Sequence, residues 1–477
     1  MSEPFLSNDA PETVGGFLES VPFENIAVGS TASVTRTLTE DRLLLFASSS
    51  GDVNPAHLDQ AYAENSFFHR IIAHGMWTGS LISAVFGTIL PGPGTIYLSQ
   101  SLRFIRPVNL GDVITASVIA REKRDEKRLV VFDCRCVNQR GEKVLEGTAE
   151  VIAPAEKIRL PRRNLPEIQV RRHERQAQWV AMCKTLSPIK TAIVHPCDRL
   201  SLEGAIAAKE AGLIVPVLVG NEKKIRATAQ RESLNIEGYA IVSALHSHDA
   251  AAKAVALAVA GEVGLLMKGS LHTDELMHAV AAPASGLRTA RRMSHAFVMD
   301  VPAYKQPLII TDAAVNIYPT LDEKRDIVQN AIDLAFVLGF REPKVALLSA
   351  AETVSPKIIS TIDAAALCKM ADRGQISGGI LDGPLAFDDA ISAEIAREKG
   401  IVSSVAGQAL IFVVPDLESG NMLAKQLLLL AGAEAAGIVL GARIPIILTS
   451  RADTLRTRVA SAAIAVLAAH GGGAVSS

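Results

Sequence analysis

The chain has 477 residues, of which 49% are hydrophobic and 21% charged, so it is long enough to bury the cores of two or three domains. Its 48 Lys and Arg against 50 Asp and Glu leave a net charge of -2, which excludes the basic field that general nucleic-acid binding needs. No apolar run reaches the ~18 residues of a membrane span, the polar start lacks a signal-peptide pattern, and five cysteines make no disulfide framework. We expect a cytoplasmic protein that binds neither membrane nor nucleic acid.

The distribution of aromatic residues divides the chain into two parts. Twelve of the 21 aromatic residues lie within residues 1–155, whereas the longer remainder is rich in alanine. Between the two parts lies a segment with seven Lys and Arg, two prolines and no apolar period, which is typical of a solvated linker and less often of a CoA-phosphate or RNA patch. We predict one domain over 1–155, a basic linker over 156–175 and a second domain over 176–477.

The first part predicts an α+β domain. Residues 71–90 form an apolar segment long enough for a helix, and its apolar side chains cover more than one helical stripe, so the helix should be buried. Four strand-like runs follow and predict an antiparallel sheet that could wrap this helix. These runs are IYLSQSLRFI, DVITASVIA, LVVFDCRCVN and KVLEGTAEVIA.

The segment SSSGDVNPAHLDQAYAE, residues 48–64, carries the first set of chemical groups. Asn54 followed by proline predicts the N-cap and first turn of a helix that continues to residue 64. His57 then lies where the helix dipole disfavours an imidazolium, with Asp52 in the loop beside it. A carboxylate and a neutral imidazole could hold and activate a water molecule, although a plain capping loop would have the same pattern.

A second feature is the His-Gly pair that precedes the apolar helix. Gly75 allows a ligand to approach closely, and its backbone N–H could polarise a carbonyl oxygen. Ser83 lies two turns further along, where a serine in isolation is more often a small packing residue.

Three motifs within residues 20–153 resemble the MaoC-like (R)-specific enoyl-CoA hydratases of hot-dog fold: GDVNPAH, AHGM and PGPGTIYLSQSLRFIRPVNLGD. The resemblance implies that Asp52 and His57 activate water and that Gly75 is the oxyanion donor. It also implies that Ser83 is a supporting hydrogen bonder and that Asn54 contributes to substrate binding. The implied reaction adds water to a trans-2-enoyl-CoA and gives an (R)-3-hydroxyacyl-CoA, without metal or redox cofactor.

The second part alternates short apolar runs with alanine-rich helical segments, which predicts an α/β domain with a mainly parallel sheet. The expected strands are IVPVLVG, PLIIT, VALLS, GGILDG, ALIFVVPD, AGIVLG and PIILTS. Ligands of such sheets bind beyond the carboxyl ends of the strands. Polar residues collect in four loops at expected strand ends, over 311–319, 381–391, 413–427 and 448–454.

These four loops supply the second set of candidate residues. Ser450 and Arg451 place a hydroxyl beside a guanidinium that is suited to bidentate phosphate contact. Each loop taken singly could be ordinary strand-to-helix punctuation, but their common position at strand ends favours a shared site. The further candidates, all for substrate binding, are Asp312, Asn316, Asp382, Ser419 and Asn421.

The same loops, together with LMKGSLHT and RRMSHAFVMD, resemble the phosphate acetyl/butyryltransferase family over residues 176–472. The resemblance implies the fold of isocitrate and isopropylmalate dehydrogenases, and reversible acyl transfer between CoA sulfur and inorganic phosphate. Ser450 and Arg451 match the family's Ser-Arg pair. Acetyltransferases of the family carry a catalytic Asp seven residues after that serine, where this chain has Thr457, and the runs LMKG and TSRAD look closer to the butyryltransferase branch.

Together the two parts predict a bifunctional acyl-CoA enzyme. Its substrates would be CoA thioesters and inorganic phosphate, with no bound cofactor and no metal. Both resemblances imply a homo-oligomer, either a dimer or a multiple of dimers. The alternative is an active hydratase whose C-terminal domain binds acyl-CoA or acyl phosphate without turnover.

Overall fold

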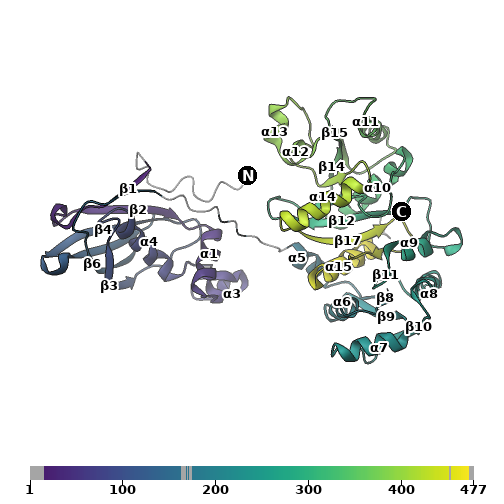
Figure 1. The fold of residues 1–477 in the computed structure, drawn as a ribbon, viewed down its shortest axis with the longest axis horizontal. Coiled ribbons are helices and arrows are strands. Elements are labelled where there is room, and N and C mark those ends of the chain that lie inside the picture. Colours follow the sequence, from purple (N-terminus) through teal and green to yellow (C-terminus); the bar gives the residue numbers. More distant parts are fainter. Residues whose placement is uncertain (1–15, 163–167, 169, 171–174, 451–452, 472–477) are drawn as a thin grey trace. The chain divides into compact units, whose positions relative to one another are not determined.

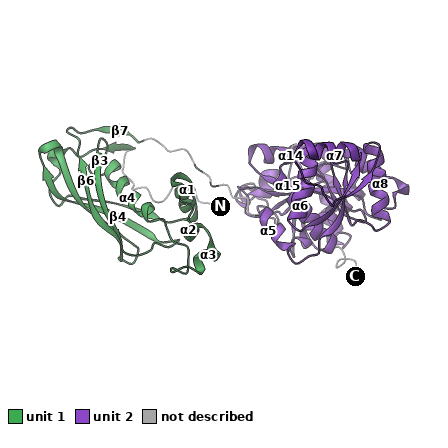
Figure 2. Ribbon diagram, turned by 90° about the horizontal axis from the view of Figure 1, so that it is seen from below, with its two compact units in different colours: residues 1–171 green, residues 172–477 purple. Residues whose placement is uncertain are grey.

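The computed structural model describes residues 16–162, 168, 170, 175–450 and 453–471. The chain divides into two compact units, residues 1–171 and 172–477, which are coloured separately in Figure 2. Each unit has its own hydrophobic core. Within the described ranges, no helix is both long enough and apolar enough to cross a membrane.

The first unit is a five-stranded antiparallel sheet, ordered β2-β4-β5-β6-β3, that packs on the buried helix α4 (Figure 1). The ring of Phe86 in α4 lies 5.0 Å from that of Phe132 in β5, and both are fully buried. The predicted α+β architecture is therefore confirmed. The elements are β1 (Phe17–Glu19), β2 (Thr31–Thr37), α1 (Glu40–Ser50), α2 (Pro55–Leu58), α3 (Gln60–Glu64), α4 (Gly75–Thr88), β3 (Ile96–Phe104), β4 (Val113–Arg124), β5 (Leu129–Val137), β6 (Lys143–Ile152) and β7 (Arg159–Pro161).

Three details of this unit differ from the expectation. The helix predicted to run to residue 64 is broken at Asp59, whose carboxylate accepts the N–H of Tyr62 at 3.0 Å and so starts α3 afresh. Strand β2 was not predicted, and it pairs with β4. Strand β7 pairs with β1, so part of the segment expected as linker over 156–175 belongs to this unit.

The second unit is an eleven-stranded sheet with helices on both faces, in the order β10-β9-β8-β11-β18-β17-β12-β13-β16-β14-β15. Along β8, Ile193 packs in the core under α6 and α15, whereas Ala192 and Val194 pack in the core under α8. All seven predicted strand segments are confirmed. The elements are α5 (Arg175–Met182), β8 (Ile189–Val194), α6 (Arg199–Glu210), β9 (Ile214–Gly220), α7 (Glu222–Arg231), β10 (Ala240–Ser243), α8 (Ser247–Val259), β11 (Leu265–Lys268), α9 (Thr273–Ala281), β12 (Ser294–Asp300), β13 (Leu308–Thr311), α10 (Leu321–Val337), β14 (Lys344–Leu348), α11 (Ile359–Asp372), β15 (Ile380–Leu385), α12 (Phe387–Ile391), α13 (Ala393–Glu398), β16 (Ile411–Val413), α14 (Leu417–Leu430), β17 (Glu434–Leu440), β18 (Ile446–Ile447) and α15 (Leu455–Gly471).

The direction of the strands reverses in the middle of this sheet. Strands β8 to β11 and β18 run parallel to one another, but β17 is antiparallel to both β18 and β12, and β12 is antiparallel to β13. The carboxyl ends of β13, β14, β15 and β16 therefore lie at the edge opposite to that of β18. The prediction that the four polar loops share one edge is wrong, because the loop over 448–454 stands apart from the other three.

Candidate active sites

In the first unit, the structure brings Asp52 and His57 together and adds His74, to which the sequence analysis assigned no role. Side-chain atoms of the three residues lie within 4.8 Å of one another. His57 belongs to α2, and the rings of His57 and His74 lie 3.9 Å apart. His74 is the N-cap of α4 and is buried, whereas Asp52 is exposed in the loop before α2. The only sequence signal for His74 was its place directly before the apolar helix.

Hydrogen bonds to carbonyl oxygens determine which ring nitrogen of each histidine carries a hydrogen. His57 Nδ1 lies 2.8 Å from the carbonyl oxygen of Ile72, which can only accept, so Nδ1 carries the hydrogen and Nε2 offers a lone pair. His74 Nε2 donates in the same way to the backbone oxygen of Asp52 at 2.9 Å. His74 thereby holds the Asp52 loop, and its own Nδ1 is buried with no partner among the described residues. The pair predicted to activate water therefore has a lone pair and a carboxylate at one point.

A cavity of about 270 Å³ connects this point to Gly75. Gly75 is the first residue of α4, where backbone N–H groups have no partner within the helix. His57 and Phe104 line the same cavity as Gly75. A Cβ at position 75 would lie only 3.0 Å from the Phe104 ring. The glycine therefore keeps the approach to its N–H open.

The other two candidates of this unit are placed differently. Asn54 is the N-cap of α2 as predicted, with its side-chain oxygen accepting the N–H of Ala56 at 3.1 Å. Ser83 lies outside the group around His57. It is exposed, it does not line the cavity, and it lies eight positions after Gly75, which corresponds to about 12 Å along α4.

Two groups in the described part of the chain have the donor atoms to hold a cation. One is the set of Asp52, His57 and His74, since imidazole and carboxylate are both zinc ligands. The other is a set of three carboxylates, Glu352, Asp388 and Asp389, and there Lys399 already supplies the countercharge at 2.7 to 3.1 Å.

In the second unit, the Ser450 loop joins β18 to α15 and rests on two buried cations. Ser450 N–H donates to Asp453 Oδ2 at 2.6 Å, and its carbonyl accepts from Arg458 Nη2 at 2.9 Å. Arg458, which is 3% exposed, also donates to Thr449 Oγ1 at 3.0 Å. Lys268 is 4% exposed, and its Nζ lies 3.5 Å from the carbonyl oxygen of Thr449.

Sequence reasoning missed both cations. A lysine closing the apolar run of β11 and an arginine inside an alanine-rich helix were the available signals. Asp453 stands between these charges: burial raises the pKa of its carboxyl group, while the Ser450 N–H, Arg458 and Lys268 act in the opposite direction. Arg451 lies outside the described residues, so its predicted role stays a prediction.

The loops after β8 and β11 lie at the same edge as Ser450, because β11 pairs in parallel with both β8 and β18. The carbonyl of His195, directly after β8, accepts from Ser270 N at 3.0 Å and from Ser270 Oγ at 2.7 Å. A Cβ at Gly269 would lie 2.3 Å from the carbonyl oxygen of Val194, so only glycine fits there. Helices α6, α9 and α15 begin at this edge, and their N-termini favour a bound anion.

Asp312 and Asn316 lie at the opposite edge, are buried, and use their polar side-chain atoms for hydrogen bonds within the protein. Asp312 Oδ2 accepts from Asn316 Nδ2 at 2.5 Å and from the backbone N–H of His295 at 3.1 Å, and Oδ1 accepts two N–H groups of its own loop. Burial raises the pKa of Asp312, and these hydrogen bonds oppose the rise. Asn316 Oδ1 accepts from Arg292 Nε at 2.7 Å. The two residues hold the loop between β13 and α10.

The three remaining candidates also make internal hydrogen bonds at this edge. Ser419 lies in the first turn of α14, where its N–H donates to the capping residue Asp416 at 2.8 Å. Asn421 Nδ2 donates to the carbonyl oxygen of Ala313 at 3.2 Å. Asp382 lies inside strand β15 and not in a loop after it.

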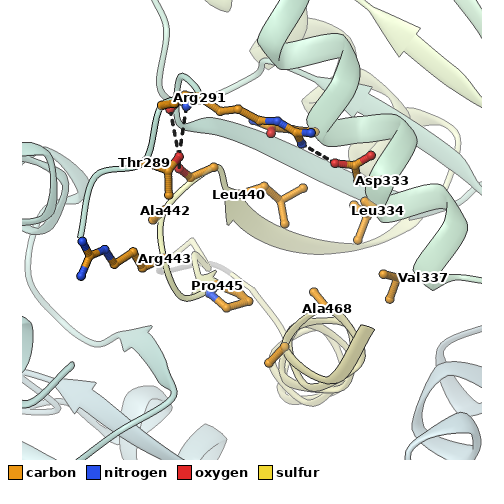
Figure 3. Close-up of a pocket in the computed structure, with 14 residues that line it drawn as sticks. Thr289, Arg291, Asp333, Leu334, Val337, Leu440, Ala442, Arg443, Pro445 and Ala468 are labelled. Atoms are coloured by element: carbon orange, nitrogen blue, oxygen red, sulfur yellow. Dashed lines mark hydrogen bonds and ion pairs between the residues drawn. The ribbon is translucent and has the colours of Figure 1, made fainter. Parts of the chain in front are cut away.

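A further cavity of about 670 Å³ lies where the chain turns from β17 to β18 (Figure 3). Its floor is apolar, with Leu440 and Ala468, and an ion pair between Arg291 and Asp333 lies at one side. Arg443 points away from that ion pair. The carboxyl end of β17 lies at the edge opposite to Ser450. None of the predicted site residues lines this cavity.

Two family models match the chain. The model described as "Phosphate acetyl/butaryl transferase" matches residues 243–466, and the model described as "MaoC like domain" matches residues 24–137. A phosphate acetyltransferase from Rhizobium meliloti is 64% identical over 288 residues, which cover 60% of this chain and 91% of that protein.

Two solved structures are similar to separate parts of the chain. A branched-chain phosphotransacylase from Enterococcus faecalis V583 is 29% identical, with a TM-score of 0.52 and coverage of 59% of this chain and 99% of that one. The unliganded R-hydratase PhaJ1 from Pseudomonas aeruginosa is 46% identical, with a TM-score of 0.31 and coverage of 32% of this chain and 99% of that one. The chain therefore belongs to the phosphate acetyl/butyryltransferase family and carries an additional N-terminal MaoC-like hydratase domain.

Proposed function

We propose that the second unit transfers an acetyl group reversibly between CoA and inorganic phosphate. The observation that carries the proposal is the Ser450 loop, held over Lys268 and Arg458 at an edge where helices α6, α9 and α15 begin. The 64% identity to a phosphate acetyltransferase supports acetyl as the acyl group, in place of the butyryl group that short sequence runs suggested.

The transfer requires little covalent help from the protein. The CoA thiolate attacks the acyl carbon of acetyl phosphate, the carbon–oxygen bond to phosphate breaks, and phosphate leaves with the electron pair. Fixed positive charge and helix N-termini around the leaving group stabilise the developing negative charge, because they need no reorganisation during the reaction. In this proposal Ser450 and Arg451 contact the phosphate, and Lys268 and Arg458 position their loop.

The test is phosphate-dependent release of CoA from acetyl-, butyryl- and 3-hydroxybutyryl-CoA by the full-length protein. We expect acetyl-CoA to be the best substrate and Arg451→Ala to lower turnover at least 100-fold, since one lost charge-stabilising donor commonly costs 10²–10³. Arg443→Ala is the matched control, because Arg443 is exposed at the other edge of the sheet. Saturable binding of acetyl-CoA without turnover would instead establish a binding domain attached to a hydratase.

We propose further that the first unit hydrates trans-2-enoyl-CoA to (R)-3-hydroxyacyl-CoA. The observation that carries this proposal is the meeting of Asp52 and His57 beside a cavity that also reaches Gly75. Asp52 and His57 Nε2 hold the water: Nε2 takes one of its protons as oxygen adds to C3 and then returns that proton to C2, while the Asp52 carboxylate accepts the other hydrogen of the water and orients it. The N–H of Gly75 stabilises the negative charge on the thioester oxygen.

The test is the hydration of crotonyl-CoA, which is measured as the loss of its enoyl absorbance. We expect His57→Gln to lower kcat by 10²–10⁴, which is the usual contribution of a general acid or base. His69→Asn is the control, since His69 also bonds a carbonyl oxygen through Nδ1 but is exposed and does not line the cavity. Equal activity of the two variants would contradict the assignment.

We also propose that the protein forms a homo-oligomer. Strand β3 lies at an edge of its sheet and exposes three large apolar side chains, Ile96, Leu98 and Phe104, each at about half of its full area. An edge strand with apolar side chains is suited to pairing with another copy. Light scattering at micromolar concentration would contradict the proposal if it gave the mass of one chain, 50.6 kDa.

A further inference from the structure

The proposed transfer from acetyl phosphate to CoA needs a group that takes the proton of the CoA thiol. A free thiol has a pKa of about 8.5, so only a few per cent of CoA is the reactive thiolate at pH 7. Thr457, in the first turn of α15, cannot serve, because a hydroxyl is no base at neutral pH and its Oγ1 bonds Thr454 Oγ1 at 3.1 Å. The proton acceptor must therefore come from another residue at the Ser450 edge.

Two carboxylates at this edge already accept hydrogen bonds from backbone N–H groups. Asp453 Oδ2 accepts the N–H of Ser450 at 2.6 Å and keeps the loop closed. Asp198 is the N-cap of α6, and its Oδ1 accepts the N–H of Ser201 at 2.8 Å. Protonation of either group would weaken the structure that it supports.

His195 is built into the edge in an unusual way. Its φ of 55° lies in the left-handed region, which a residue other than glycine seldom adopts unless its surroundings impose it. The surroundings here are the N–H and hydroxyl of Ser270, which both bond the His195 carbonyl. The His195 Nδ1 atom lies 3.8 Å from Cys197 Sγ, and no described residue bonds Nε2. The tautomer with hydrogen on Nδ1 therefore leaves the Nε2 lone pair available.

The surroundings of His195 favour the neutral form of its imidazole, mainly because the side chain is partly buried. Burial lowers the pKa of His195, and the Lys224 ammonium lowers it further. The groups that face the ring come from the loop before α6 and from α7, α8 and α9; they are Asp198, Lys224, His246 and Glu275, with Cys197 beside Nδ1. The two carboxylates act in the direction opposite to burial.

The loop that carries His195 lies at the same edge of the sheet as the loop of Ser450. Strands β8 and β18 each pair with β11, so their carboxyl ends lie about 10 Å apart at a strand spacing of ~4.8 Å. Burial lowers the pKa of Arg458, and the charges of Asp453 and Asp198 both oppose that shift, so carboxylates from the loops after β18 and β8 act on the same guanidinium.

Resting on the proposed transferase function, we propose that His195 is the catalytic base that deprotonates CoA. The thiol proton passes to Nε2 as the sulfur–carbon bond forms at the acyl carbon and the carbon–oxygen bond to phosphate breaks. The imidazolium then gives its proton to the departing phosphate or to water, and in the reverse reaction the same nitrogen protonates the leaving thiolate.

The test compares His195→Asn with the wild type for CoA and acetyl phosphate between pH 6.5 and 9.5. Asparagine tolerates the left-handed conformation but cannot accept the proton. We expect kcat at pH 7 to fall about 100-fold, within the usual range for a general base, and KM for acetyl phosphate to stay unchanged. The variant's rate should then rise about tenfold per pH unit toward the thiol pKa, so that the defect shrinks to a few-fold above pH 9, where CoA ionises without help. His470→Asn, at the far end of α15, should keep wild-type rates.

Three outcomes would overturn the proposal. Wild-type turnover by His195→Asn would show that no base is needed at this position, and a deficit that is equal at every pH would show a structural role only. Cys197→Ala tests the remaining possibility, that Cys197 is a covalent nucleophile. We expect the kcat of this variant to fall only a few-fold. Complete inactivity would instead assign His195 and Cys197 to covalent catalysis. If the wild type itself shows no phosphate-dependent turnover, the proposed transferase function fails and His195 loses its role with it.

Discussion

Replacement of Arg458 by methionine should both destabilise the second unit and slow the proposed transfer. The guanidinium is 3% exposed and makes two hydrogen bonds, to Thr449 Oγ1 and to the Ser450 carbonyl. A hydrogen bond to a charged group contributes about 1.5–3 kcal/mol, so the loss of both predicts about 3–6 kcal/mol. Methionine keeps most of the packing against α6, so this loss comes mainly from the polar contacts.

Thermal unfolding and CoA release, measured on the same preparations, check the prediction. At roughly 2–4 °C per kcal/mol for a large domain, the second unit of Arg458→Met should melt at least ~6 °C lower than the wild type. Crotonyl-CoA hydration by the first unit should stay unchanged and serves as an internal control. Arg456→Met is the matched variant: this residue lies on the same helix and pairs with Glu434 at 3.4 Å, but 57% of its side chain is exposed, so we expect less than ~1 kcal/mol. Equal melting temperatures for the two variants would refute the reasoning.

Three further predictions follow from the geometry. Burial lowers the pKa of His295 to about 3, whereas the unfolded residue titrates near 6.5, so protonation favours unfolding. The free energy of unfolding should therefore fall as pH drops below 6.5, by about 2 kcal/mol at pH 5. Urea titrations of His295→Leu should not show this loss. Gly269→Ala should abolish acetyl transfer while crotonyl-CoA hydration persists, because its Cβ would lie 2.3 Å from the Val194 carbonyl oxygen. His74→Phe should lower hydratase kcat 10–100-fold with little change in circular dichroism, since it keeps an aromatic ring but loses the bond to the Asp52 carbonyl.

Local sequence predicted the elements of both units well where a single physical cause decides them. The apolar segment over 71–90 is a helix because its side chains are apolar on more than one face, and α4 is accordingly buried. Asn54 caps α2 as predicted, because an amide side chain before a proline satisfies an N–H of the first turn. The helix predicted to follow ends early, since Asp59 starts a second cap that competes with continuation.

The meeting of Asp52 and His57 could also be predicted, because they lie only five positions apart in one loop and turn. His74 could not be assigned to that group from spacing, since its contact with the Asp52 carbonyl joins residues 22 positions apart. Ser83 is exposed on α4 and does not line the cavity, so its predicted supporting role stays a prediction.

The sequence by itself determined the two fold classes and brought Asp52 and His57 together in the first site, because these depend on periodicity, capping and short separations. Only the tertiary structure decided which strand ends meet in the second unit. Strand direction depends on pairing between distant segments, and the antiparallel strands β12 and β17 reverse it in mid-sheet. That reversal separates Asp312 from Ser450 and brings His195, Lys268 and Arg458 to the Ser450 edge, because parallel neighbours share one carboxyl edge.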